Sequence, residues 1–145
     1  MPTPAVDRQI EASLADRGLR YTPGRRAVIR ILLAADGPLS VAQMHDVLHG
    51  EEPLSSLYRS CAVLEKAGTL SPHTARGLTR YELAEWLTGH HHHLICTECG
   101  NIEDFTLPAE MEQTFGILIG RVAESQGFLA TDHMLEISGK CRRCR

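Results

Sequence analysis

The sequence contains no apolar run that approaches the ~20 residues needed to span a bilayer as a helix. Its first residues, MPTPAVDRQIEASL, also lack the basic and then apolar pattern of a secretory signal. We therefore expect a cytoplasmic protein with no membrane partner. Thiols stay reduced in that compartment, so the five cysteines favour metal binding over disulfides.

The chain also has little net charge, −3 over 145 residues, so its overall composition does not favour a polyanionic partner. A site for nucleic acid would have to be local. Residues 17–30 provide one such place, because they contain five arginines and no acid. A solvated helix face is the alternative explanation for this stretch.

A third absence concerns catalysis, since the sequence has no His-Glu-x-x-His motif. A zinc hydrolase would need an open metal position, a general base and a substrate pocket, and no comparable motif supplies them. We therefore expect no enzymatic activity and keep a zinc hydrolase as the least favoured alternative.

The first half of the chain carries the periodic apolar positions of four helices. The predicted helices cover residues 7–16, 22–36, 40–50 and 55–68. Thr22 is the expected N-cap of the second helix, and Ser40 and Gln43 have capping-box spacing at the start of the third. Ser55 or Ser56 is the expected cap of the fourth.

Two short extended runs follow the fourth helix, at residues 69–74 and 79–84, and surround Ala-Arg-Gly-Leu. This pattern predicts a hairpin. Helices followed by a two-stranded wing are typical of a winged helix-turn-helix, whose fourth helix would lie in the major groove of DNA. We therefore expect a DNA-binding domain over residues 1–84.

The chain changes character at residues 85–90, which we interpret as a hinge. Beyond it, strands are predicted over residues 92–96, 101–107 and 128–139, and a helix over 108–126. Residues 91–145 would thus form a small α/β domain. The expected fold class is α+β, an N-terminal winged helix-turn-helix followed by this domain.

Two Cys-x-x-Cys pairs predict a closed, four-coordinate zinc site. The pairs are Cys96 with Cys99 and Cys141 with Cys144. Each pair can present two thiolates from one tight turn, and four sulfurs leave no open position for catalysis, so the site would be structural. A redox dithiol is the alternative, but such a motif usually stands alone beside a βαβ pattern. The fifth cysteine, Cys61, is expected to be a small buried apolar residue.

Four consecutive histidines, at positions 90–93, predict further metal binding. In a strand, His90 and His92 would point to one face and His91 and His93 to the other, which allows two separate sites. Each face needs further ligands from elsewhere in the sequence. The candidates are Glu82, Glu110, Glu112 and His133.

Three motifs together resemble the ferric uptake regulator family of bacterial metal-dependent repressors, which includes zinc uptake regulators. They are GLRYTPGRRAVI, SSLYRSCAVLEKAGTL, and HHHHLICTECG followed by GKCRRC, and the resemblance covers nearly the whole chain. It implies a winged helix, a C-terminal dimerisation domain, and a homodimer that binds palindromic operator DNA when its regulatory metal is bound. The implied function is repression in metal homeostasis.

The resemblance also implies three metal sites. The structural zinc ligands would be Cys96, Cys99, Cys141 and Cys144. The regulatory site at the hinge would contain Glu82, His91 and His93. The second site, in the dimerisation domain, would contain His90, His92, Glu112 and His133, with Glu110 as the alternative to Glu112.

At the DNA, Tyr58 is expected to meet a base edge or a thymine methyl group, and Arg20 and Arg59 to pair with phosphates. Ser55 and Ser56 would contact either a base or a phosphate. The alternative for Tyr58 is a position in the core.

Two departures from the family pattern leave the fourth ligand of the hinge site open. Zinc regulators commonly carry a cysteine two residues after the position of Glu82, where this chain has Ala84. The loop DGPLS also lacks the histidine that members sensing other metals draw from this place, which leaves His73 as a candidate. The regulatory metal is expected to be Zn²⁺ or Fe²⁺, with Mn²⁺ and Ni²⁺ as alternatives, because imidazole suits several of these ions. A peroxide-sensing, iron-dependent repressor on the same fold is the main alternative function.

Overall fold

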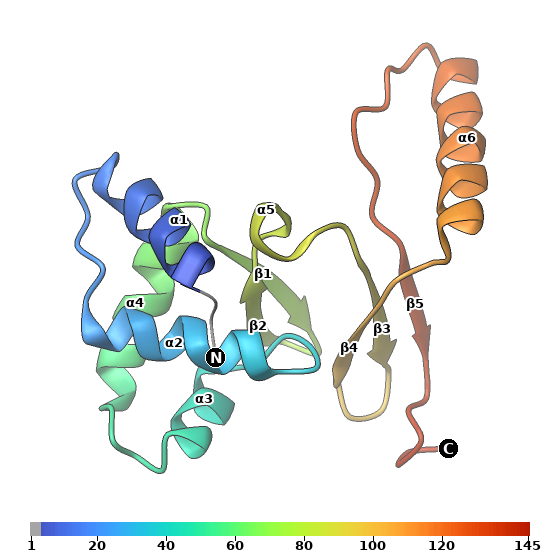
Figure 1. Cartoon of the computed structure of the whole chain (residues 1–145). Coiled ribbons are helices and arrows are strands. Elements are labelled where there is room, and N and C mark those ends of the chain that lie inside the picture. The colour runs from blue at the N-terminus through green and yellow to red at the C-terminus, as the bar shows by residue number, and fades with distance from the viewer. Residues whose placement is uncertain (1–3) are drawn as a thin grey trace. The chain divides into compact units, whose positions relative to one another are not determined.

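A computed structural model describes residues 4–145, and the chain divides into two compact units (Figure 1). The first unit ends at Gly89 and the second extends from His90 to Arg145. None of the helices in this described range is long and apolar enough to cross a membrane.

Four helices form most of the first unit. They are α1 (Pro4–Ala15), α2 (Pro23–Ala34), α3 (Val41–Val47) and α4 (Leu54–Lys66). The predicted caps of α2 and α3 are confirmed, because Thr22 accepts a hydrogen bond from the Arg25 backbone and Ser40 forms a complete capping box with Gln43. The predicted cap of α4 is wrong. This helix begins after Pro53, whose restricted backbone suits the position, so Ser55 and Ser56 already lie inside its first turn.

The apolar faces of the four helices meet in one core. Its fully buried side chains include Ile10, Leu14, Val28, Ile29, Met44, Leu57 and Leu64. Cys61 belongs to the same core, with its Sγ 3.9 Å from the Met44 Sδ, which confirms that it is a buried apolar residue. Burial raises the pKa of the Cys61 thiol to about 12, so this thiol stays protonated and unreactive.

The predicted hairpin is confirmed as the antiparallel strands β1 (Leu70–Ala75) and β2 (Leu78–Leu83). Arg76 and Gly77 at its tip both have positive φ angles, 53° and 73°, as a tight hairpin turn requires. A single short helix, α5 (Glu85–Thr88), follows in the predicted hinge.

The second unit combines a three-stranded sheet with one long helix. The strands are β3 (His92–Cys96), β4 (Ile102–Phe105) and β5 (Glu136–Gly139), in the order β4-β3-β5, and the helix is α6 (Ala109–Ser125). β3 is antiparallel to β4 and parallel to β5. The α+β fold class and all four predicted elements are confirmed.

One predicted boundary in the second unit is wrong, because the last strand, β5, begins at Glu136 and not at residue 128. His133 therefore lies in the segment before β5 and not in the strand. The Asp132 side chain accepts a hydrogen bond from the His133 backbone N–H at 2.8 Å, and so takes a donor that a strand would use for pairing.

Candidate metal centres

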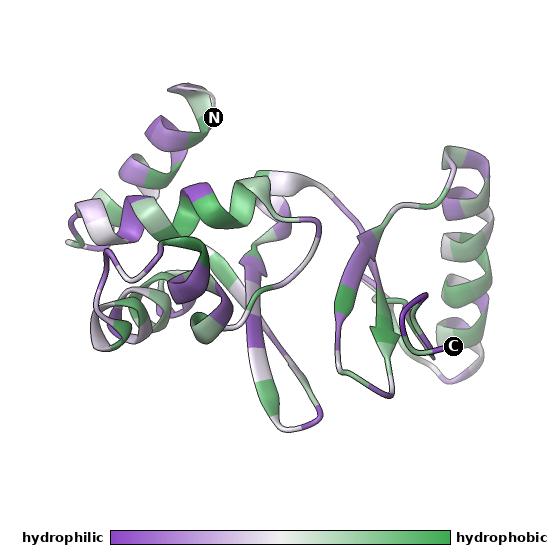
Figure 2. Cartoon of the chain, turned by 90° about the horizontal axis from the view of Figure 1, so that it is seen from below, coloured by the Kyte–Doolittle hydropathy of each residue, from purple (hydrophilic) through white to green (hydrophobic). Residues whose placement is uncertain are grey.

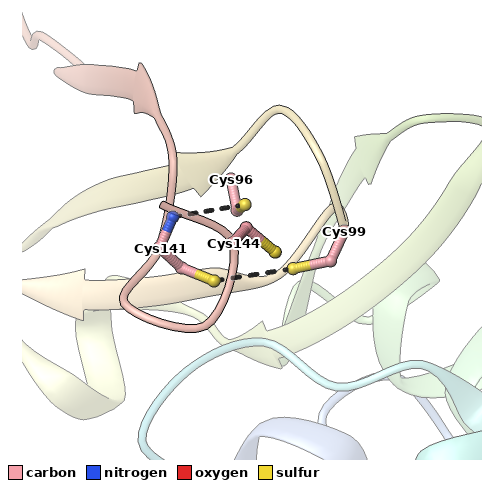
Figure 3. A group of neighbouring side chains, drawn as sticks. All are labelled: Cys96, Cys99, Cys141 and Cys144. Atoms are coloured by element: carbon pink, nitrogen blue, oxygen red, sulfur yellow. Dashed lines mark hydrogen bonds between the residues drawn. The ribbon is translucent and has the colours of Figure 1, made fainter.

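Four cysteine side chains from two distant parts of the second unit converge on one point (Figure 3). Cys96 and Cys99 flank the turn after β3, while Cys141 and Cys144 follow β5. Their sulfur atoms all lie within 4.8 Å of one another, and the Cys99 and Cys141 sulfurs are 3.8 Å apart. A tetrahedron with zinc–sulfur bonds of 2.3 Å has an edge of about 3.8 Å, so the cluster has the size of a zinc site.

The pKa values of these thiols also fit a site that binds a cation. Hydrogen bonds from the Cys99 and Cys141 backbones lower the pKa of Cys96 to about 6, while the hydrogen bond with Cys141 raises the pKa of Cys144 to about 12. A thiolate at one position therefore opposes ionisation at another. A bound cation removes this conflict, because it stabilises several thiolates together.

A second cluster lies beside α6 and contains the four residues that the resemblance assigned to the second site. These are His90, His92, Glu112 and His133, with one ligand atom each, all within 4.8 Å of one another. The Glu112 Oε1 lies 2.8 Å from the His133 Nε2, and its Oε2 lies 2.8 Å from the His92 Nε2. The His90 Nε2 is 3.3 Å from Glu112 and also 3.3 Å from the His133 Nε2. Three imidazoles around one carboxylate are a donor set for a divalent transition metal.

Glu112, and not Glu110, faces this cluster. Glu110 is exposed and belongs to none of the groups of ligand atoms found in residues 4–145. The hydrogen bond from His92 lowers the pKa of Glu112 below its ordinary value, so the carboxylate is ionised as a metal ligand must be. His92 itself is fully buried, which holds its ring in place.

The opposite face of β3 carries a third group, formed by His91, His93 and Asp104. Their ligand atoms also lie within 4.8 Å of one another, and the His93 Nε2 is 3.7 Å from the Asp104 Oδ1. The sequence pattern does not single out Asp104. The pairing of β3 with β4 does, because it places Asp104 opposite His93, whereas the neighbouring acid Glu103 points to the other face.

The first unit carries a histidine–carboxylate pair on its wing. The His73 Nε2, from β1, lies 2.6 Å from the Glu82 Oε1, from β2, and both side chains are nearly buried, at 12% and 10% exposure. Glu82 is one of the predicted hinge ligands and His73 is the candidate for the missing one. Imidazole nitrogen and carboxylate oxygen are both suitable ligands for divalent transition metals.

The side chains expected to contact DNA lie on an accessible face of the first unit. Tyr58 is 55% exposed, so the alternative that it belongs to the core is wrong. Arg20, Ser55 and Arg59 are also exposed, and Ser56 is half-buried and accepts a hydrogen bond from Arg59 at 3.4 Å.

A groove of about 560 Å³ adjoins this face, between the start of α2 and one side of α4. The Glu52 carboxylate lies in its wall, and Thr22, Arg25, Ser56 and Arg59 contribute cationic and hydroxyl groups. These are the groups that proteins use to contact the phosphates of DNA.

Comparisons with known proteins agree with these features. The model of the ferric uptake regulator family matches residues 16–138. The peroxide-responsive repressor PerR of Staphylococcus aureus strain Mu50 is 28% identical over 149 residues, which cover 97% of this chain and 95% of that protein. A zinc-bound manganese uptake regulator is similar in structure, with a TM-score of 0.67 and 32% identity over 91% of this chain and 98% of that one. The Helicobacter pylori ferric uptake regulator Fur, described as having three functional metal binding sites, has a TM-score of 0.74 and 25% identity over 97% of this chain and 91% of that one.

Replacing Cys96 with Ser is expected to release zinc and unfold the second unit. Structural zinc in a small site can supply on the order of 10 kcal/mol of folding free energy. Zinc content after dialysis and thermal unfolding would measure the effect. Cys61→Ser, in the core of the first unit, is the matched control and should retain zinc. A stable, zinc-free, dimeric Cys96→Ser protein would contradict the structural role of the cluster.

Replacing Glu112 with Gln is expected to weaken metal binding at the second cluster by about 100-fold or more, at or above the upper end of what the loss of an outer-shell partner costs. Competition with a chromophoric chelator, on protein that retains its structural zinc, would measure the affinity. Glu110→Gln removes the same charge two residues earlier in the first turn of α6, from a side chain that does not face the cluster, and should leave the affinity unchanged. Equal effects of the two substitutions would show that Glu112 acts only through its charge.

Proposed function

Because the chain belongs to the ferric uptake regulator family, it is a metal-responsive transcriptional regulator, and we propose that it represses genes of metal homeostasis as a homodimer on operator DNA. One observation carries this proposal. The unit with the accessible α4 carries the His73–Glu82 pair, while the start of the other unit carries His91 and His93. Such a regulator acts on chromosomal DNA in the cytoplasm and has no need of a catalytic site.

We place the regulatory site at the hinge, with Glu82 from the first unit and His91 and His93 from the second. His73 and Asp104 are the candidates for the remaining ligand. Ligands from two units can be satisfied together only in one relative placement of those units, so a bound metal selects that placement. The coupling is reciprocal, and operator DNA must therefore tighten metal binding by the same factor.

The selected placement would present the two α4 helices of a dimer to successive major-groove faces of DNA, roughly 34 Å apart or a multiple of that. Tyr58 would then meet a base edge or a thymine methyl group, and Arg20 and Arg59 would pair with phosphates. Ser55 and Ser56 would contact either a base or a phosphate. The exposure of Tyr58 and the arginine and hydroxyl groups of the adjoining groove support this arrangement.

Exposed apolar side chains in the second unit support the homodimer. None of the residues of α6 is buried, and apolar segments recur along this helix in Figure 2. Its most exposed large apolar side chains are Met111, Ile117, Leu118 and Val122, each more than half exposed, and Phe128 and Leu129 follow directly after it. An apolar surface of this kind marks a protein–protein interface, and the partner we propose is a second copy of the chain.

We propose three metal sites in each chain. The cysteine cluster would hold structural Zn²⁺, and the cluster around Glu112 would hold a second ion. The hinge site would hold regulatory Zn²⁺ or Fe²⁺, with Mn²⁺ and Ni²⁺ as the alternatives. The similarity to a Fur protein with three functional metal sites supports this number, and the similarity to a zinc-bound manganese regulator supports zinc and manganese among these ions.

A peroxide-sensing, iron-dependent repressor is a second candidate function. The similarity to PerR favours it, and so does the chemistry of the hinge ligands, which are imidazoles and carboxylates without a thiolate. A histidine oxidised after peroxide treatment of the iron-loaded protein would distinguish this function from metal sensing.

Substitution of His91 with Ala is expected to abolish metal-dependent operator binding while the protein remains a folded, zinc-containing dimer. His93→Ala and Glu82→Ala should behave alike, because only the hinge site couples metal to the placement of the units. Fluorescence anisotropy of labelled operator DNA at buffered metal concentrations would measure this response.

The matched controls for the hinge are His90→Ala and His133→Ala, which remove imidazoles from the other face. They should shift the metal dependence or the stability of the dimer and leave some switching. Equal loss of response in His90→Ala and His91→Ala, with the same metal stoichiometry, would mean that the histidines form one merged site.

Arg59→Ala is expected to weaken operator binding for all sequences and to reduce the salt dependence of the binding constant by about one unit of log–log slope. This is the result expected for a lost phosphate contact. Titrations at several salt concentrations would measure the slope. Arg121→Ala, the same charge change on α6, should leave it unaltered. An unchanged slope in Arg59→Ala would place Arg59 away from the phosphates.

A further inference from the structure

A buried arginine on the wing has no role in the site described so far. Arg80, in β2, is only 6% exposed, and its Nε and Nη1 atoms have no hydrogen-bond partner in the part of the chain that the structure describes. A guanidinium remains charged at any pH that a cell reaches. Burying a charge without a partner is unfavourable, so a residue in this state points to a functional constraint.

The position of Arg80 identifies that constraint. In the hairpin it lies directly opposite His73, and cross-strand partners of this kind share one face. Glu82 is two residues further along β2 and therefore lies on the same face, about 7 Å away along the strand. The short contact between His73 and Glu82 shows that these two side chains do point to one side of the hairpin. A permanent cation is thus carried on the same face of the hairpin as the carboxylate proposed to bind the regulatory metal.

We propose that Arg80 sets the metal threshold of the hinge site. Its charge compensates the negative charge of Glu82 when no metal is bound, and it repels a divalent cation that binds there. The regulator then responds only at a higher metal concentration than the ligands alone would dictate. This inference rests on the proposed function, because it concerns the same site.

Two other roles for Arg80 do not fit its surroundings. A contact with DNA phosphate requires an accessible side chain, unlike the 6% exposure of Arg80. A role in holding the hairpin together requires hydrogen bonds, and its Nε and Nη1 make none to residues 4–145. A neutral side chain of similar length should therefore preserve the fold and remove only the charge.

The sign and size of the effect follow from Coulomb's law. At a separation equal to the spacing of residues 80 and 82 along the strand, about 7 Å, a unit charge and a divalent ion repel each other enough in water to weaken binding about tenfold. The lower dielectric constant of a partly buried site increases the effect. Removing the charge should tighten metal binding at the hinge by tenfold or more.

The experiment compares Arg80→Met with Arg80→Lys in the full-length, zinc-replete protein. Both variants, and the background protein with which they are compared, carry Glu112→Gln, so that the hinge is the site being titrated. Affinity for Zn²⁺ and for Mn²⁺ is measured by competition with a chelator, without DNA. Arg80→Met should bind at least tenfold more tightly than the background protein, and Arg80→Lys, which retains the charge, should stay within about threefold of it.

Arg76→Met is the matched control, because it removes the same charge from the tip of the same hairpin. Arg76 lies more than a Debye length from Glu82 along the strand and should leave the affinity unchanged. If Arg80→Met does not fold, Arg80→Gln, with a shorter neutral side chain, provides the same comparison.

Equal or weaker metal affinity in a folded, neutral variant at position 80 would overturn the role of Arg80. The same result for Arg76→Met as for Arg80→Met would also overturn it, since net charge alone would then explain the change. Two other results would reject the proposed function instead. In one, the Glu112→Gln protein binds no metal at the hinge. In the other, it binds metal there but its affinity for operator DNA does not change.

Discussion

Both histidine clusters depend on one geometric constraint, the alternation of side chains along β3. His92 and His93 are neighbours in sequence and both are buried, yet they contact different partners. His92 lies against Glu112 of α6, while His93 lies against Asp104 of β4. A strand sends successive side chains to opposite faces, so one short run of histidines supplies two separate sets of ligands. A helix at this position would instead spread four consecutive side chains around its axis, with no two neighbours on one face.

The second unit has little else to hold it together. Among residues 90–145 the buried apolar side chains are those of Cys96 and Ile102, whereas the first unit has a continuous core. The four cysteines join the turn after β3 to the segment after β5, and both lie at the carboxyl end of this parallel pair of strands. A domain with so small a core needs metal or a partner subunit for stability, and the proposed zinc and homodimer would provide both.

In the first unit, the end of the helix proposed to read DNA is joined to the start of the hinge. The Trp86 Nε1 donates a hydrogen bond to the Gly68 carbonyl at 2.8 Å, and the Ala84 N–H donates to the Thr69 carbonyl at 2.9 Å. Gly68 and Thr69 lie just after the C-cap of α4, Ala67, and Ala84 and Trp86 lie just beyond Glu82. These two hydrogen bonds give the segment after Glu82 a direct connection to the end of α4.

Local patterns in the sequence were enough to predict the helices, the hairpin and the sheet of the second unit, because periodicity and capping act over a few neighbouring residues. The cysteine pairs could also be recognised, since each carries its own spacing. The choice of Glu112 over Glu110 came from the family resemblance. The contact of Asp104 with His93, the pairing of His73 with Glu82 and the burial of Arg80 could not be derived from local patterns. Each depends on strand register or on the packing of a helix against a sheet, and these bring together residues whose separation along the chain carries no signal. The sequence by itself therefore determined the elements and the kinds of ligand, and the tertiary structure decided which ligands meet.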